Sequence, residues 1–158
     1  MATGKSELPI LHPITGFKLG TTSAGIKTPG RPDLVIMEVS EGSSVAALFT
    51  KNAFCAAPVT VCKQRLLRSR PRYLVTNTGN ANAGTGEQGL LDATLTCSNL
   101  AALAEVDIDT ILPFSTGVIG EPLPMDRLLA GLPGAFQNLS ESGWAAAAEG
   151  ILTTDTRA

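Results

Sequence analysis

The segment Tyr73–Val106 (YLVTNTGNANAGTGEQGLLDATLTCSNLAALAEV) decides the class of fold, because it joins a predicted strand to a predicted helix through a long loop. Tyr73–Thr76 is a short apolar run typical of a strand. Asn77–Gly89 holds four glycines and three asparagines, which tolerate positive φ and hydrogen-bond their own backbone, so it predicts a loop. Leu90–Val106 then predicts a helix with one apolar face. That face carries Ala93, Cys97, Leu100 and Ala104.

Upstream of this segment, the sequence predicts short strands separated by turns. They are Phe17–Gly20, Gly25–Lys27, Leu34–Val39, Val45–Thr50 and Val59–Cys62. Leu34–Val39 (LVIMEV) is nearly continuous in apolar side chains, which favours a strand. Because the turn residues Glu41–Ser44 separate it from Val45–Thr50, we expect these two strands to form a hairpin.

Downstream, strands and helices continue to be mixed. Ile111–Phe114 predicts a short buried strand, and a helix is expected from about Met125 until Pro133 interrupts it. The last helix has an apolar stripe, and Ser140 or Ser142 is expected to cap its start. The stripe comprises Trp144, Ala147, Ala148 and Ile151. The mixture predicts an α/β or α+β class, and 158 residues suit one domain over residues 1–158.

The composition is poor in charge. Charged residues make up 16% of the chain, whereas about 25% is usual for a globular domain. Hydrophobic residues make up 44%, which is enough for a sizeable core. A surface with so few charges indicates either that another chain or segment covers part of it, or that the domain is simply rich in alanine and glycine. Composition alone leaves both interpretations open.

Several classes of protein are disfavoured. The net charge of −2 and the scarcity of aromatic residues argue against nucleic-acid binding. The apolar runs are shorter than the ~18 residues of a membrane span, and the first residues do not resemble a signal peptide, so we expect a cytoplasmic protein with no membrane contact. Cys55, Cys62 and Cys97 are odd in number and irregularly spaced, which favours reduced, buried thiols over disulfides or a metal site.

One glycine motif offers an alternative function. Gly84–Gly89 (GTGEQG) matches G-x-G-x-x-G and precedes a predicted helix, and Glu105 lies about where a ribose-binding acid would lie. However, the dinucleotide fingerprint places its first glycine directly after the strand, whereas Asn77–Ala83 intervene here. Glu87 also brings a negative charge to the turn that would hold the phosphate. Dinucleotide binding therefore stays the weaker alternative to a packed loop.

A second glycine motif follows a buried strand. Ser115–Gly120 (STGVIG) brings a small hydroxyl residue and a glycine to a bend, where backbone N–H groups point outward together. An oxyanion hole needs this geometry, although an ordinary turn has it too. Hydrolase motifs are absent: the single histidine, His12, lies beside Pro13, and no G-x-S-x-G elbow occurs. No His, Cys and acid cluster suggests a metal site.

Five segments in this order resemble the ornithine acetyltransferase family, the bifunctional glutamate N-acetyltransferases of arginine biosynthesis. They are Thr22–Lys27 (TSAGIK), Asn52–Val59 (NAFCAAPV), Asn77–Ala83 (NTGNANA), Ser115–Gly120 (STGVIG) and Thr153–Thr156 (TTDT). None is specific alone, but together they span nearly the whole chain. The resemblance implies a mixed, layered α/β sandwich of the type shared with self-processing aminopeptidases, which are a related alternative.

The resemblance also implies a reaction. Family members move an acetyl group from N-acetylornithine to glutamate, and some also accept acetyl-CoA; no other cofactor is expected. The precursor cleaves itself at an Ala–Thr bond into α and β chains, which usually assemble as an (αβ)2 heterotetramer. The freed β-chain threonine is the nucleophile, with its own amine as base. The family roles map onto Thr116 and Gly117 as the oxyanion hole and onto Thr153 as a substrate contact.

One departure from the family pattern limits these expectations. In the family, the α chain continues some tens of residues beyond TTDT, with a substrate-binding lysine and a glycine-rich approach to the cleavage bond. Neither is present after Thr153–Thr156. We therefore expect an incomplete α-chain portion that holds no nucleophile and is inactive alone.

Overall fold

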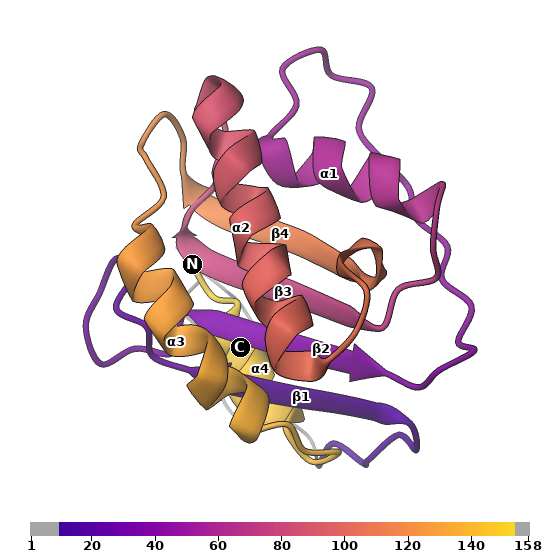
Figure 1. The fold of residues 1–158 in the computed structure, drawn as a ribbon. Helices are drawn as coiled ribbons and strands as arrows, with labels where there is room; N and C mark the ends of the chain where they lie inside the picture. Colours follow the sequence, from indigo (N-terminus) through magenta and orange to yellow (C-terminus); the bar gives the residue numbers. More distant parts are fainter. Residues whose placement is uncertain (1–9, 154–158) are drawn as a thin grey trace.

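The computed structural model describes residues 10–153, whose centre is a sheet of four strands in the order β1-β2-β3-β4 (Figure 1). The strands are β1 (Phe17–Thr22), β2 (Leu34–Val39), β3 (Tyr73–Asn80) and β4 (Ile111–Val118). β1 pairs with β2, and β2 with β3, in antiparallel fashion, whereas β3 and β4 are parallel. The predicted α/β class is confirmed.

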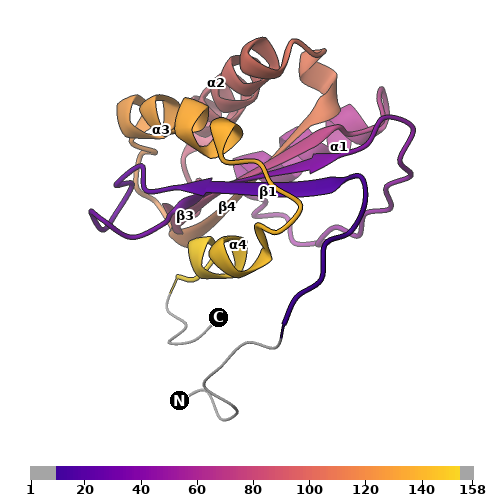
Figure 2. The same cartoon turned by 90° about the horizontal axis from the view of Figure 1, so that it is seen from below.

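Helices cover both faces of this sheet. Within the described residues they are α1 (Ala57–Leu66), α2 (Gly86–Ala104), a 3-10 turn η1 (Ile108–Thr110), α3 (Met125–Gln137) and α4 (Trp144–Gly150). Figure 2 shows α2 and α3 on one face and α4 on the opposite face. α2 connects the parallel strands β3 and β4, because parallel neighbours need a crossover rather than a tight turn. No helix within residues 10–153 has both the length and the apolar content to cross a membrane.

The main core lies between the sheet and the helices α2 and α3. Its largest buried side chains are Leu34, Ile36, Val75, Leu100, Ile111, Leu128 and Leu132. A smaller cluster of Leu19, Val35 and Ala147 lies under α4, where the rings of Phe17 and Trp144 stack with centroids 5.2 Å apart. β2 is therefore covered on both faces, which explains why its sequence is a nearly continuous apolar run.

The predicted strand at residues 45–50 and its hairpin with β2 are wrong. β2 is flanked on both edges by β1 and β3, so no edge remains for a further strand. Residues 45–50 form an exposed stretch without regular secondary structure. The predicted strand at residues 25–27 is also wrong, because a buried carboxylate holds this segment as a loop, as described below.

The predicted strand at residues 59–62 is a helix, α1. Pro58 stands in its first turn, where a missing N–H costs nothing, and basic side chains stand in its last turn. Burial of Val61 and Cys62 outweighs the strand preference of the β-branched residues.

Several element bounds also differ from the prediction. β3 continues to Asn80 and α2 starts at Gly86, so the long loop shrinks to residues 81–85. α3 continues through Pro133 without interruption, since its buried face packs against β1 and β2. Neither Ser140 nor Ser142 caps α4; Gly143 stands at that position and offers no side-chain acceptor.

Candidate functional site

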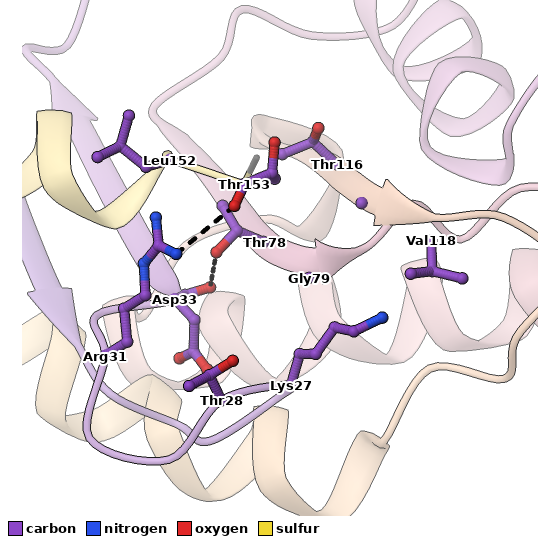
Figure 3. Close-up of a pocket in the computed structure, with 11 residues that line it drawn as sticks. Lys27, Thr28, Arg31, Asp33, Thr78, Gly79, Thr116, Val118, Leu152 and Thr153 are labelled. Atoms are coloured by element: carbon purple, nitrogen blue, oxygen red, sulfur yellow. Dashed lines mark hydrogen bonds between the residues drawn. The ribbon is translucent and has the colours of Figure 1, made fainter. Parts of the chain in front are cut away.

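A cavity of about 430 Å³ opens at the carboxyl ends of the parallel strands β3 and β4 (Figure 3). β3, β4, the loop between β1 and β2 and the segment after α4 contribute its walls. Its lining comprises Lys27, Thr28, Arg31, Asp33, Thr78, Gly79, Thr116, Gly117, Val118, Leu152 and Thr153. Ligands of open α/β sheets bind in this position, beyond the carboxyl ends of the strands.

The three residues that the sequence singled out meet in this cavity. Thr116 and Gly117 come from the end of β4, and Thr153 comes from the segment after α4. Figure 3 shows Thr116 and Thr153 at the same end of the cavity. The remainder of the TTDT motif, residues 154–156, lies outside the described residues.

β4 approaches β3 so closely at Gly117 that only glycine fits at this position. A Cβ atom on Gly117, whose φ is +140°, would lie 2.3 Å from the carbonyl carbon of Gly79. The register of the pair is irregular at the same place, between Gly79 and Asn80. Gly117 thus exposes the backbone of β4 beside the cavity, at the place where the pairing with β3 becomes irregular.

Buried asparagines hold this irregular strand end. The side chain of Asn77 accepts a hydrogen bond of 2.6 Å from the Ser115 hydroxyl across the β3–β4 pair. The Asn80 side chain accepts from the Asn82 N–H at 2.8 Å, and its amide donates to the carbonyls of Glu121 and Pro122. The asparagines of the NTGNANA segment are therefore structural supports and do not line the cavity.

Two hydrogen bonds tie the Thr153 segment to the rest of the cavity. The Thr78 hydroxyl donates to the carbonyl of Gly150, the last residue of α4, at 3.3 Å. The Arg31 guanidinium donates to the Thr153 carbonyl at 3.5 Å. The chain around Thr153 is thus held by β3 at Gly150 and by the β1–β2 loop at Thr153 itself.

Asp33 organises the β1–β2 loop. Its buried carboxylate accepts hydrogen bonds of 2.6 Å from the backbone N–H groups of Ala24 and Ile26. Its own carbonyl accepts from the Thr78 N–H at 2.9 Å, which joins the loop to β3. Lys27 is presented to the cavity by the loop that these bonds hold.

No role could be predicted from the sequence for Lys27, Arg31, Asp33 or Thr78. Lys27 ends the TSAGIK segment, but nothing local shows that its loop folds over β3. The one available signal was Asp33, an acidic residue directly before a strand that is buried on both faces, where a carboxylate needs partners.

The side chains of the cavity suit a ligand that presents an anionic group or a carbonyl oxygen. It contains two cations and one carboxylate, and that carboxylate is already satisfied by backbone donors. Neither a histidine nor a cysteine is among the described residues that line it. Burial raises the pKa of Cys62 to about 12 and that of Cys97 to about 11, so these thiols stay protonated at neutral pH.

The glycine motif at residues 84–89 does not fit a dinucleotide site. β3 ends at Asn80, and α2 begins at Gly86, in the middle of the motif. Glu87 lies in the first turn of α2, where a pyrophosphate would have to bind. No group of three or more His, Cys, Asp or Glu side chains in the described part of the chain could hold a metal ion.

Comparisons with known proteins decide the family. The model of the ArgJ family matches residues 18–158, which is most of the chain. This chain belongs to the ArgJ family. It is 60% identical to the arginine biosynthesis bifunctional protein ArgJ of Pseudomonas syringae pv. tomato, over 99% of this chain and 38% of that protein. The ArgJ protein of Methylococcus capsulatus is 58% identical over 93% of this chain and 36% of its own length.

Solved ArgJ structures share the fold. The ornithine acetyltransferase of Mycobacterium tuberculosis, in complex with ornithine, superposes with a TM-score of 0.85 at 37% identity, covering 91% of this chain and 78% of that one. The ArgJ protein of Bacillus halodurans gives 0.81 at 34% identity, covering 90% and 74%. The resemblance to ornithine acetyltransferases is confirmed, and the chain spans 38% of the length of the Pseudomonas relative.

Proposed function

We propose that this chain is the N-terminal, α-chain part of an ArgJ enzyme that transfers acetyl from N-acetylornithine to glutamate. The observation that carries the proposal is the meeting of Thr116, Gly117 and Thr153 in one cavity, although about 35 residues of chain separate β4 from Thr153. The names of the relatives, an arginine biosynthesis protein and an ornithine acetyltransferase, support the same activity.

The reaction has two acyl-transfer steps. The hydroxyl of a β-chain threonine, absent from this chain, attacks the acetyl carbonyl of N-acetylornithine, and its proton passes to the α-amine of the same threonine. The tetrahedral intermediate collapses, the C–N bond breaks, and ornithine leaves with that proton. The amine of glutamate then attacks the acetyl-threonine ester, which releases N-acetylglutamate and restores the threonine hydroxyl.

Thr116 and Gly117 would stabilise the negative oxygen of both tetrahedral intermediates. The Thr116 hydroxyl or the neighbouring backbone N–H groups are the candidate donors, and Gly117 has no side chain to block the approach of an oxyanion. Thr153 would contact the amino-acid part of the substrate. Acetyl-CoA is a second candidate acyl donor, which the geometry neither favours nor disfavours.

An apolar hollow on the surface supports a covering partner. Residues 45–50, α1 and the outer side of β4 enclose about 480 Å³, and Leu48 and Phe114 are exposed there. Monomeric proteins rarely leave such apolar patches open. We propose that the β part of the same precursor, released by autocatalytic cleavage, covers this hollow, and that the cytoplasmic enzyme is an (αβ)2 heterotetramer in which residues 1–158 belong to one domain.

The test is to join this chain in frame to the remaining C-terminal part of the Pseudomonas syringae relative. This protein, called the joined precursor below, is assayed beside the isolated chain for self-cleavage and for transfer of acetyl from N-acetylornithine to glutamate. We expect both activities from the joined precursor and neither from the isolated chain. Hydrolysis of peptide substrates without acetyl transfer would favour the aminopeptidase alternative. Acetyl transfer by the isolated chain would place the nucleophile within these residues and refute the mechanism.

A further inference from the structure

Lys27 is a charged group of the cavity that has no role in the reaction above. Its side chain lines the cavity together with Thr116 and Thr153, and in Figure 3 it extends away from Arg31, toward Val118. Within residues 10–153 its ammonium group makes neither a hydrogen bond nor an ion pair. It is therefore free to meet an anionic ligand.

The backbone that carries Lys27 is held from two sides. The N–H of the preceding residue, Ile26, donates to the buried carboxylate of Asp33 at 2.6 Å. On the other side, a Cβ atom on Gly79 would lie 2.7 Å from the Cβ atom of Lys27, so the missing side chain of Gly79 lets Lys27 lie directly against β3. These two contacts fix the position from which the Lys27 side chain enters the cavity.

The other charged groups of the cavity are already engaged. The Asp33 carboxylate accepts two backbone hydrogen bonds, and the Arg31 guanidinium donates to the Thr153 carbonyl. Lys27 is thus the cavity cation with an unused charge among the described residues. An ammonium group binds a carboxylate as a compact point charge with three donors.

We propose that Lys27 binds a carboxylate of the amino-acid substrate, and that Asp33 and Gly79 are positioning residues for it. The inference rests on the proposed function, because both substrates are amino acids: glutamate carries two carboxylates and N-acetylornithine carries one. Lys27 would hold the amino-acid part of the substrate while Thr116 and Gly117 hold the oxygen of the acetyl group.

The experiment measures binding of N-acetyl-L-glutamate, the product, to the joined precursor by isothermal titration calorimetry, together with turnover. Lys27→Met is expected to raise the dissociation constant about tenfold, whereas Lys27→Arg keeps most of the affinity. Added salt should weaken binding to the unchanged protein and have much less effect on Lys27→Met. Lys51→Met removes an exposed lysine outside the cavity and should change neither affinity nor salt dependence.

Two further ligands distinguish the carboxylates. N-acetylglutamine lacks the side-chain carboxylate, and the α-amide of N-acetylglutamate lacks the α-carboxylate. One of these two ligands therefore lacks the carboxylate that Lys27 binds. For that ligand, Lys27→Met should have the same affinity as the unchanged protein. Equal affinities of the unchanged protein and Lys27→Met for all three ligands would overturn the inference. If the affinities are equal and the joined precursor still transfers acetyl, the role of Lys27 is refuted but the proposed function stands. If the joined precursor binds N-acetylglutamate but transfers no acetyl, and Lys27→Met weakens this binding, the role of Lys27 stands but the proposed function is refuted.

Discussion

At the scale of single residues, Gly79 is the position at which β3 lies directly against Lys27. Gly79→Ala would set a Cβ atom against Lys27 at a φ of +91°, so it should both strain the backbone and displace Lys27. Gly42→Ala is the matched control, because Gly42 has a φ of +83° and open space around it. We expect each variant to lose about 1 kcal/mol of unfolding free energy from the positive φ.

Only Gly79→Ala should also raise KM for glutamate, by about fivefold or more if Lys27 is displaced. Thermal unfolding and steady-state kinetics of the joined precursor measure the two effects. An unchanged KM in Gly79→Ala would show that the contact with Lys27 has no bearing on substrate binding.

The candidate site was predictable from sequence only in part. Thr116, Gly117 and Thr153 could be singled out because they belong to segments that resemble a known family, and they do line one cavity. Lys27, Arg31 and Asp33 were not, because their roles depend on contacts with segments that are distant in the chain, such as the close approach of Lys27 to Gly79 and the hydrogen bond from Arg31 to Thr153. No local pattern encodes such contacts.

At the scale of elements, the β1–β2 loop depends on one buried carboxylate. In Asp33→Asn, an NH2 group replaces one of the two carboxylate oxygens and faces the N–H of Ala24 or Ile26. Two hydrogen-bond donors would then face each other at a buried position. We expect a loss of about 1.5–3 kcal/mol of unfolding free energy and a higher KM for glutamate. Denaturant unfolding measures the first effect. Asp126→Asn makes the same change at an exposed position and should cost less than about 0.5 kcal/mol; similar losses in both variants would contradict the role of Asp33.

The helices α1 and α2 bring two buried thiols close together. Burial, with a smaller contribution from Cys97, raises the pKa of Cys62 from 9.0 to about 12, and burial raises the pKa of Cys97 to about 11. In the unfolded chain both thiols ionise near pH 9, whereas in the folded protein they ionise only at higher pH. The unfolding free energy should therefore be unaffected by these thiols below pH 9 and should fall as the pH rises toward 11.

The expected slope is up to about 1.4 kcal/mol per pH unit for each thiol. Urea unfolding of the joined precursor between pH 8.5 and 10.5, about the window in which the unfolded thiols ionise, measures it. Cys97→Ala should flatten the profile, whereas Cys55→Ala, which removes a thiol outside the buried pair, should keep it. If the unfolding free energy of the unchanged protein, Cys97→Ala and Cys55→Ala fell in parallel with pH, the buried thiols would not be the cause of the fall.

Element prediction failed where local preference and packing disagree. Residues 59–61 are β-branched or apolar and favour a strand locally, yet they lie in α1, because Pro58 suits a helix start and one face packs against α2 and β4. The strand Leu34–Val39 and the first half of β3, residues 73–76, were recognisable because they are short, nearly continuous apolar runs, whereas the polar second half of β3, residues 77–80, was predicted as a loop. Their order in the sheet was not, since periodicity carries no information on neighbours.

At the scale of the whole molecule, the apolar hollow around residues 45–50 should be the surface that the β part covers. Leu48 lies on this hollow, whereas Leu67, just after α1, is comparably exposed but lies outside it. In the joined precursor, Leu48→Ser should lower the unfolding free energy by about 1.5–3 kcal/mol, and Leu67→Ser should change it little. The isolated chain should aggregate, and Leu48→Ser should reduce its light scattering. Equal thermal shifts for both variants would place the partner elsewhere.

If the cavity at β3 and β4 holds the oxyanion in acetyl transfer, Thr116→Ala removes a candidate hydrogen-bond donor for it, and this variant is made in the joined precursor. The Thr116 hydroxyl makes no hydrogen bond to another residue within 10–153, so its loss should leave the melting temperature nearly unchanged. It should lower kcat for transfer from N-acetylornithine to glutamate by about 10²–10³, while Thr116→Ser, which keeps the hydroxyl, stays within about tenfold. Unchanged turnover, or a loss of turnover matched by an equal loss of stability, would show that the Thr116 hydroxyl does not stabilise the oxyanion.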